Sequence, residues 1–345
     1  MYQASEHYAA LYRNLRPRLA WRDGGDFPAW RERLHAALVE ALGLPAMAQD
    51  LADHRPRAER LDGETCDGFV RERWQLWVEP TVPLPFYLLK PADAGGRPLP
   101  LVLTPHGHNH PHIYAGISHS DDERRSMQEG QRDIAVQAVR QGYLAIAPTT
   151  RAFGATRTEK DLAENKLSSC RTALMHGLLL GRTAIGERVW DMQRLLDWAL
   201  AALPVDRQRV AITGNSGGGT VSLFAAAVEP RFTVAVPSCY FCTFAGSIGS
   251  IHHCDCNYVP GIMRLGEMGD IAGLCAPRPF RAIAGVQDDI FPIAEARKSF
   301  SHLQRIYAAA GAPEACSLFE GEGGHRYYSA GAWPFIRAAF DAQPA

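Results

Sequence analysis

The sequence predicts an α/β fold, in which helices cover both faces of a mostly parallel, twisted sheet. Short apolar runs alternate with longer amphipathic segments over most of the 345 residues, as in repeated strand-helix-strand units. A Gly-x-Ser-x-Gly pentapeptide, Gly214 to Gly218, stands between a β-branched run and a run of small helix formers. That context predicts a strand, a tight turn and a helix. Alternating residues between Phe69 and Lys90 predict two antiparallel strands at one edge of the sheet.

The other expected elements follow in chain order. Residues 1–62 are predicted to be a helical extension, because Trp30, Leu34 and Leu38 recur at helical spacing. Residues 63–345 are predicted to form the α/β domain. Its further strands are expected at 99–104, 143–147, 210–213, 232–236, 280–284 and 317–319, and its helices at 127–140, 187–203, 217–228, 294–310 and 331–342.

The composition is that of a globular protein, with 46% hydrophobic and 21% charged residues. The formal net charge of −1 gives no reason to expect nucleic acid or an anionic membrane as a partner. Residues 1–7 show no basic start followed by an apolar run, and no apolar stretch approaches the roughly 18 residues that a membrane span needs. We therefore expect the protein in the cytoplasm, with its eight scattered cysteines mostly reduced.

Ser216, at the centre of the pentapeptide, is the candidate nucleophile. A tight turn between strand and helix lifts the serine hydroxyl clear of the sheet, and the new helix offers free backbone N–H groups beside it. The alternatives are a flexible glycine loop or a phosphate cradle. No Lys-Ser or Lys-Thr pair follows, as a phosphate-binding P-loop would require.

A serine nucleophile needs a base, and the base needs a carboxylate that orients it. In a sheet wound this way both should follow later strands, in the order serine, acid, histidine. Asp288 follows the strand expected at 280–284, and His325 follows the last expected strand. They are the predicted acid and base. Asp289 is the alternative acid, and the alternative for His325 is a surface histidine in a glycine turn.

A tetrahedral intermediate also needs hydrogen-bond donors for its oxyanion. The loop after the strand at 99–104 carries His106, Gly107 and His108. We expect the backbone N–H of His108 to act together with that of Gly217. Substrate contacts are expected from three further side chains, those of His106, Tyr240 and His253.

Metal binding is the rival interpretation of these loops. Alternate residues from His106 to His112 are histidines, and the segment 252–256 reads His-His-Cys-Asp-Cys, a composition that can hold zinc. The spacings match no standard zinc pattern. We therefore expect no metal and no cofactor, and interpret Cys254 and Cys256, with Cys239 and Cys242, as small residues in a loop over the site.

Two charged features are expected to serve the structure rather than the chemistry. Asp191 and Arg194 stand at helical spacing and predict an ion pair. Arg151 follows the strand at 143–147 and is expected to shape the pocket without contacting substrate.

Taken together, the motifs at 106–107, 214–218, 285–292 and 324–325 resemble those of the α/β-hydrolase fold. The likeness covers 69–342, most of the chain. Within that superfamily, the segments 191–198 and 253–261 resemble the acetyl xylan esterase-like and dienelactone hydrolase-like branch. Two features depart from the pattern: His108 stands where several such esterases carry an aromatic residue, and residues 1–7 show no signal-peptide pattern, whereas most carbohydrate esterases of this type are exported.

The resemblance implies cofactor-free acyl transfer by Ser216, His325 and Asp288, with Gly217 and His108 binding the oxyanion. The function expected is a serine carboxylester hydrolase acting on a small acetyl-type ester, with a carbohydrate as one candidate alcohol. The alternatives are a serine peptidase or amidase of the prolyl-oligopeptidase type, a hydrolase of carbon–carbon bonds, a hydrolase-like lyase, or a binding protein without activity. The expected partner is a small-molecule ester, and self-association into a homo-oligomer is left open.

Overall fold

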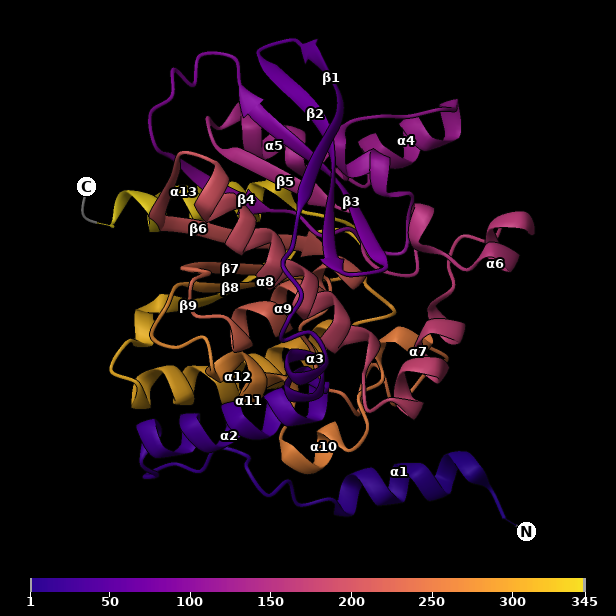
Figure 1. Cartoon of the computed structure of the whole chain (residues 1–345). Coiled ribbons are helices and arrows are strands. Elements are labelled where there is room, and N and C mark those ends of the chain that lie inside the picture. Colours follow the sequence, from indigo (N-terminus) through magenta and orange to yellow (C-terminus); the bar gives the residue numbers. More distant parts are fainter. Residues whose placement is uncertain (1, 344–345) are drawn as a thin grey trace.

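The computed structural model describes residues 2–343, and over these residues nine strands form one sheet in the order β1-β2-β3-β5-β4-β6-β7-β8-β9 (Figure 1). The strands β4 to β9 run parallel, and β1 to β3 add an antiparallel edge. The mostly parallel α/β fold expected from the alternating pattern is thus confirmed. The strands are β1 Ala58–Cys66, β2 Phe69–Glu79, β3 Val82–Pro91, β4 Leu99–Leu103, β5 Leu144–Pro148, β6 Val205–Asn215, β7 Val234–Ser238, β8 Phe280–Gly285 and β9 Cys316–Gly321.

Helices cover both faces of the sheet (Figure 1). Alternate residues of the parallel strands point to opposite sides, so Val102 belongs to the core that includes residues of α5 and α13, while Leu101 belongs to the core that includes residues of α8, α9 and α12. The helices are α1 Ala4–Asn14, α2 Phe27–Leu42, α3 Leu44–Asp50, α4 Asp121–Glu129, α5 Ile134–Arg140, α6 Glu159–Ala163, α7 Cys170–Leu179, α8 Ala184–Ala202, α9 Gly217–Val228, α10 Ile262–Leu265, α11 Met268–Gly273, α12 Ile293–Ala309 and α13 Ser329–Asp341. None of these helices is both long enough and apolar enough to cross a bilayer.

Two expected elements differ from the structure. The helix expected over 127–140 is two helices, α4 and α5, because the chain turns at Gly130 and at Gln131, whose φ of 50° lies in the left-handed region. The antiparallel edge has three strands, since β1 pairs with β2 over 58–66. Most β1 side chains are exposed, so the strand lacks the apolar alternation that would have predicted it.

The N-terminal helices differ in how they are held. Trp30, Leu34 and Leu38 of α2 are buried in the same core as the sheet and α9. By contrast, α1 has no buried residue and lies below the body of the molecule in Figure 1. The boundary expected between residues 62 and 63 falls inside β1, and α2 has no core separate from the sheet.

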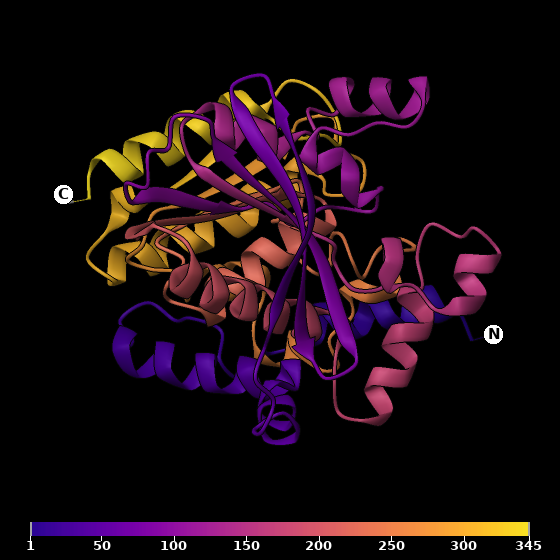
Figure 2. The same cartoon turned by 45° about the horizontal axis from the view of Figure 1, so that its top comes forward.

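Between β5 and α8 the chain makes an excursion away from the sheet. This segment carries α6 and α7, for which the sequence pattern predicted no element. Figure 2 shows the two helices at the side of the molecule, beyond the end of the antiparallel edge strands. The N-terminal residue of α7, Cys170, is buried.

Candidate active site

Ser216 occupies the turn between β6 and α9 with φ 58° and ψ −119°. This left-handed backbone is strained for a residue with a Cβ and is held by its surroundings. The backbone N–H of Ser216 donates to Ser238 O at 2.9 Å. On either side, a Cβ added at Gly214 or Gly218 would lie 2.4 or 2.0 Å from Pro105 O. Glycine is therefore required at both positions, because the elbow packs directly on the loop after β4.

His325 and Asp288 meet across two strand ends. His325 Nδ1 lies 2.8 Å from Asp288 Oδ2, so the ring donates this hydrogen bond to the carboxylate. Asp288 Oδ1 accepts from the backbone N–H groups of Ile290 and Phe291 at 2.9 and 3.1 Å, and Phe291 stacks on the His325 ring. The carboxylate is buried. Of the two aspartates considered from the sequence, Asp288 contacts His325 and Asp289 is exposed.

Ser216 and His325 line one cavity of about 320 Å³. Its wall also includes His108, Asn109, Arg132, Asn215, Ile251, His252, His253, Cys254 and Ile290. The volume is at the lower end of the range for small-molecule sites. The structure thus brings the predicted nucleophile and the His325–Asp288 pair to the same cavity, although they come from three separate strand ends.

The loop after β4 is held close to the nucleophile elbow. Gly107 N donates to Tyr114 Oη at 3.0 Å, and a Cβ at Gly107 would lie 2.8 Å from Asn215 O. Within residues 2–343, the backbone N–H groups of His108 and Gly217 donate no hydrogen bond. Two free donors beside the serine are what an oxyanion site requires.

Two of the expected substrate contacts are contradicted by burial. His106 is 1% exposed, and both ring nitrogens are used inside the protein: Nε2 accepts from Thr150 N at 2.9 Å, and Nδ1 lies 2.6 Å from Gly107 O. Burial lowers the pKa of His106 to about 3, so the ring is neutral and supports the oxyanion loop. Tyr240 is fully buried as well. His253, in contrast, does line the cavity.

Asp191 pairs with Arg151 and not with Arg194, which corrects the expected ion pair. Arg151 Nη2 lies 2.7 Å from Asp191 Oδ1, whereas Arg194 pairs with Asp197 at 2.8 Å. Arg151 also contacts the carboxylate of Glu79. This buried network fastens the loop after β5 to α8 and β2, and it keeps Arg151 out of the residues that line the cavity.

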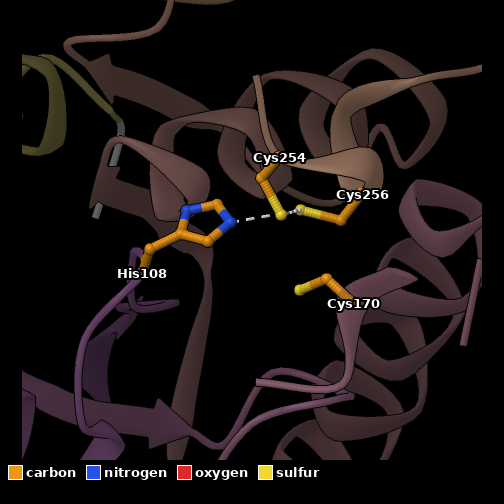
Figure 3. A group of neighbouring side chains, drawn as sticks. All are labelled: His108, Cys170, Cys254 and Cys256. Carbon is orange, nitrogen blue, oxygen red and sulfur yellow. Dashed lines mark hydrogen bonds between the residues drawn. The ribbon is translucent and has the colours of Figure 1, made fainter. Parts of the chain in front are cut away.

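Four side chains next to the cavity could hold a metal ion. Their ligand atoms, those of His108, Cys170, Cys254 and Cys256, all lie within 4.8 Å of one another (Figure 3). The sequence pattern offers the histidine loop and the segment 252–256 as a metal-binding alternative, and it gives no indication of Cys170. The one available signal was a cysteine in a polar segment, which by itself predicts little.

A strained serine between strand and helix, a paired histidine and aspartate, and a shared cavity define an α/β hydrolase. The chain belongs to this class by sequence: a model of the abhydrolase family matches residues 7–320. It is 26% identical over 285 residues to the protein named "Putative hydrolase YtaP" of Bacillus subtilis (strain 168), covering 80% of this chain and 89% of that one.

Solved structures show the same fold at low sequence identity. A Bacteroides fragilis protein described as a putative acetyl xylan esterase matches with a TM-score of 0.77 and 18% identity, over 93% of this chain and 83% of its own. A glucuronoyl esterase from Solibacter usitatus matches with a TM-score of 0.66 and 16% identity, over 94% and 97% of the two chains. At these identities the similarity concerns the fold.

Proposed function

We propose that the protein is a serine carboxylester hydrolase that acts on small acetyl-type esters, with acetylated carbohydrate as the natural class of substrate. The observation that carries the proposal is the 2.8 Å pair of His325 and Asp288 opening on the same cavity as Ser216, which stands in a left-handed turn. The modest cavity volume favours a short acyl group.

In the proposed reaction, His325 removes the proton from Ser216 Oγ as the oxygen attacks the ester carbonyl. The carbonyl oxygen becomes an oxyanion beside the backbone N–H groups of Gly217 and His108. His325 then gives its proton to the departing alkoxide, which leaves an acyl-enzyme and a free alcohol. Water, deprotonated by the same ring, releases the acid and restores the serine. Asp288 keeps the ring in the tautomer with the proton on Nδ1 and stabilises its charged form.

The names of the structural neighbours, an acetyl xylan esterase and glucuronoyl esterases among them, support ester hydrolysis on this fold and suggest the substrate classes to compare. We also propose the cytoplasm as the compartment. The eight cysteines, all within residues 2–343, form no disulfide, which is in keeping with a reducing environment.

The test is hydrolysis of p-nitrophenyl esters from acetate to octanoate, acetylated xylose, a methyl uronate and aminoacyl anilides, by wild type and Ser216→Ala. We expect the highest kcat/KM on acetyl esters and a loss of at least about 10⁴-fold in Ser216→Ala. Ser301→Ala, an exposed position on α12, serves as the matched control and keeps full activity. Preference for the uronate would overturn the acyl assignment. Preference for anilides would favour a peptidase, and equal activity of Ser216→Ala would overturn the mechanism.

A further inference from the structure

We propose that His108, Cys170, Cys254 and Cys256 bind one zinc-class divalent ion in a closed tetrahedral site beside the active-site cavity. The inference does not depend on the substrate or on the activity of Ser216. The spacing of histidines and cysteines in the sequence led to the expectation of no metal. The proposal differs from that expectation because the fold brings together ligands from three segments that are far apart in the chain.

The geometry of the four ligand atoms fits a tetrahedron. Cys256 Sγ lies 3.3 Å from His108 Nε2 and 3.3 Å from Cys254 Sγ, and Cys170 Sγ completes the group within 4.8 Å (Figure 3). Zinc bonds of about 2.3 Å to sulfur and 2.0 Å to nitrogen separate tetrahedral ligand atoms by about 3.5–3.8 Å. Small adjustments of side chains therefore suffice to place an ion between them.

The donor set is that of a structural zinc site. Three thiolates and one imidazole fill all four positions, which leaves no place for a reactive water. Cys170 is the first residue of the ten-residue helix α7, and the positive end of the helix dipole favours its thiolate. Asp255, between the other two cysteines, pairs with Arg171 of α7 at 3.1 Å, so the two cysteine segments are already fastened together.

The buried positive charge of Arg188 beside the cluster favours a metal–thiolate group with a net negative charge. Arg188 is 3% exposed, and no carboxylate in residues 2–343 lies within 4.0 Å of it. Its Nη2 atom lies 3.4 Å from Cys170 Sγ and 3.0 Å from Arg151 O. A buried cation without a counter-ion is costly. Three thiolates on a divalent ion carry a net charge of −1, and this charge would neutralise the guanidinium.

The site would connect the metal to the cavity wall. His108 and Cys254 both line the cavity, and a Cβ built at Gly217 would lie 3.2 Å from His108 Nδ1. With Nε2 bound to metal, the ring proton must sit on Nδ1, on the side of the nucleophile elbow. The ion would therefore hold the oxyanion loop, the start of α7 and the loop 251–257 in one arrangement.

The first test measures metal in the intact protein. The full chain is purified under reducing conditions from cells grown with zinc, and its metal is quantified by mass spectrometry. We expect about one equivalent of zinc per chain. After exchange for cobalt(II), we expect ligand-field bands of a tetrahedral ion and a thiolate-to-cobalt charge-transfer band. An empty protein that still binds neither zinc nor cobalt on titration would overturn the proposal, as would a Cys254–Cys256 disulfide in the reduced preparation.

The second test locates the ion with variants. Cys256→Ser should lower bound zinc to less than a tenth of an equivalent, while Cys66→Ser, a cysteine of β1 far from the cluster in the chain, should keep one equivalent. Ser216→Ala should also keep it, which separates metal binding from catalysis. Retention of a full equivalent by Cys256→Ser would overturn the assignment. If that variant does not fold, the cobalt spectrum of the wild-type protein decides, since it requires no substitution.

Discussion

Asp288 receives three hydrogen bonds, and only one of them comes from His325. Oδ2 lies 2.8 Å from the imidazole Nδ1, while Oδ1 is occupied by two backbone N–H groups of the following turn. The turn therefore fixes the carboxylate before the ring binds it. This arrangement explains why neighbouring Asp289, which is exposed, cannot substitute for it without a rearranged backbone.

The first prediction concerns this pair. Asp288→Asn should lower kcat on p-nitrophenyl acetate by about 10³–10⁴-fold, because an amide can donate to Nδ1 and select the wrong ring tautomer. Asp289→Asn is the matched control, with an expected change of less than twofold. Steady-state kinetics on both variants decides the matter, and the reverse ranking would assign the role to Asp289.

The second prediction concerns the close approach of the elbow to the β4 loop. Gly218→Ala should destabilise the fold by about 3 kcal/mol or more, because the new Cβ would lie 2.0 Å from the backbone oxygen of Pro105. Gly177→Ala in α7 meets only atoms at 3.4 Å or beyond and should stabilise by up to about 1 kcal/mol. Urea unfolding measures both. Equal effects in the two variants would contradict the steric argument.

The third prediction is a pH dependence of stability. Burial alone would raise the pKa of Glu79, but Arg151 and Arg182 outweigh it and hold the pKa below the usual 4.5. A depressed pKa means stability that is present above pH 4.5 and lost as the pH falls through the lower, folded-state value. Glu79→Gln should cost about 3 kcal/mol at pH 7, because it breaks a buried pair.

Unfolding free energies at several pH values test this difference. The gap between wild type and Glu79→Gln should be constant above about pH 5 and shrink below pH 4.5. Glu59→Gln, whose partner Arg57 lies 3.8 Å away at the surface, should change stability by less than about 0.5 kcal/mol. A difference in unfolding free energy that widens toward low pH would show that folding raises the pKa of Glu79 and does not lower it.

The fourth prediction compares the contributions of α1 and α2 to the stability of the fold. Removal of residues 2–14 should leave the protein folded and lower Tm by only a few degrees, since α1 contributes no buried side chain. Leu38→Ala in α2 should cost about 2–5 kcal/mol, because Leu38 is fully buried in the main core. Thermal unfolding checks both. A Leu38→Ala protein as stable as the wild type would contradict the contribution of α2 to the main core.

The sequence predicted the parallel sheet and the meeting of Ser216, Asp288 and His325 at one cavity for a physical reason. The carboxyl ends of parallel strands share one edge of the sheet, so residues that follow such strands converge even when the loops cannot be described. Local pattern was enough for α9, whose observed bounds are those expected. Both predictions needed only the local sequence pattern and the order of the elements along the chain. Neither required knowledge of contacts between distant segments.

Features that depend on contacts between distant segments were out of reach. His106 has the residue type and position of a substrate contact, but its ring turns inward to Thr150, a partner that no spacing reveals. Cys170 stands alone in its segment until the fold brings it to Cys254 and Cys256. The break at Gln131 requires a left-handed residue that is not glycine, which propensity alone does not predict.

The helix that follows the nucleophile is buried along its whole length, from Gly217 to Val228. Every substitution in it would disturb packing, so this part of the chain has little freedom to vary. The cavity wall, by contrast, is built largely from loops such as 251–254, which touch the core at few points. Evolution can therefore change the substrate while keeping the reaction. The reaction depends on the tightly packed helix after the nucleophile, whereas substrate choice depends on the loops of the cavity wall.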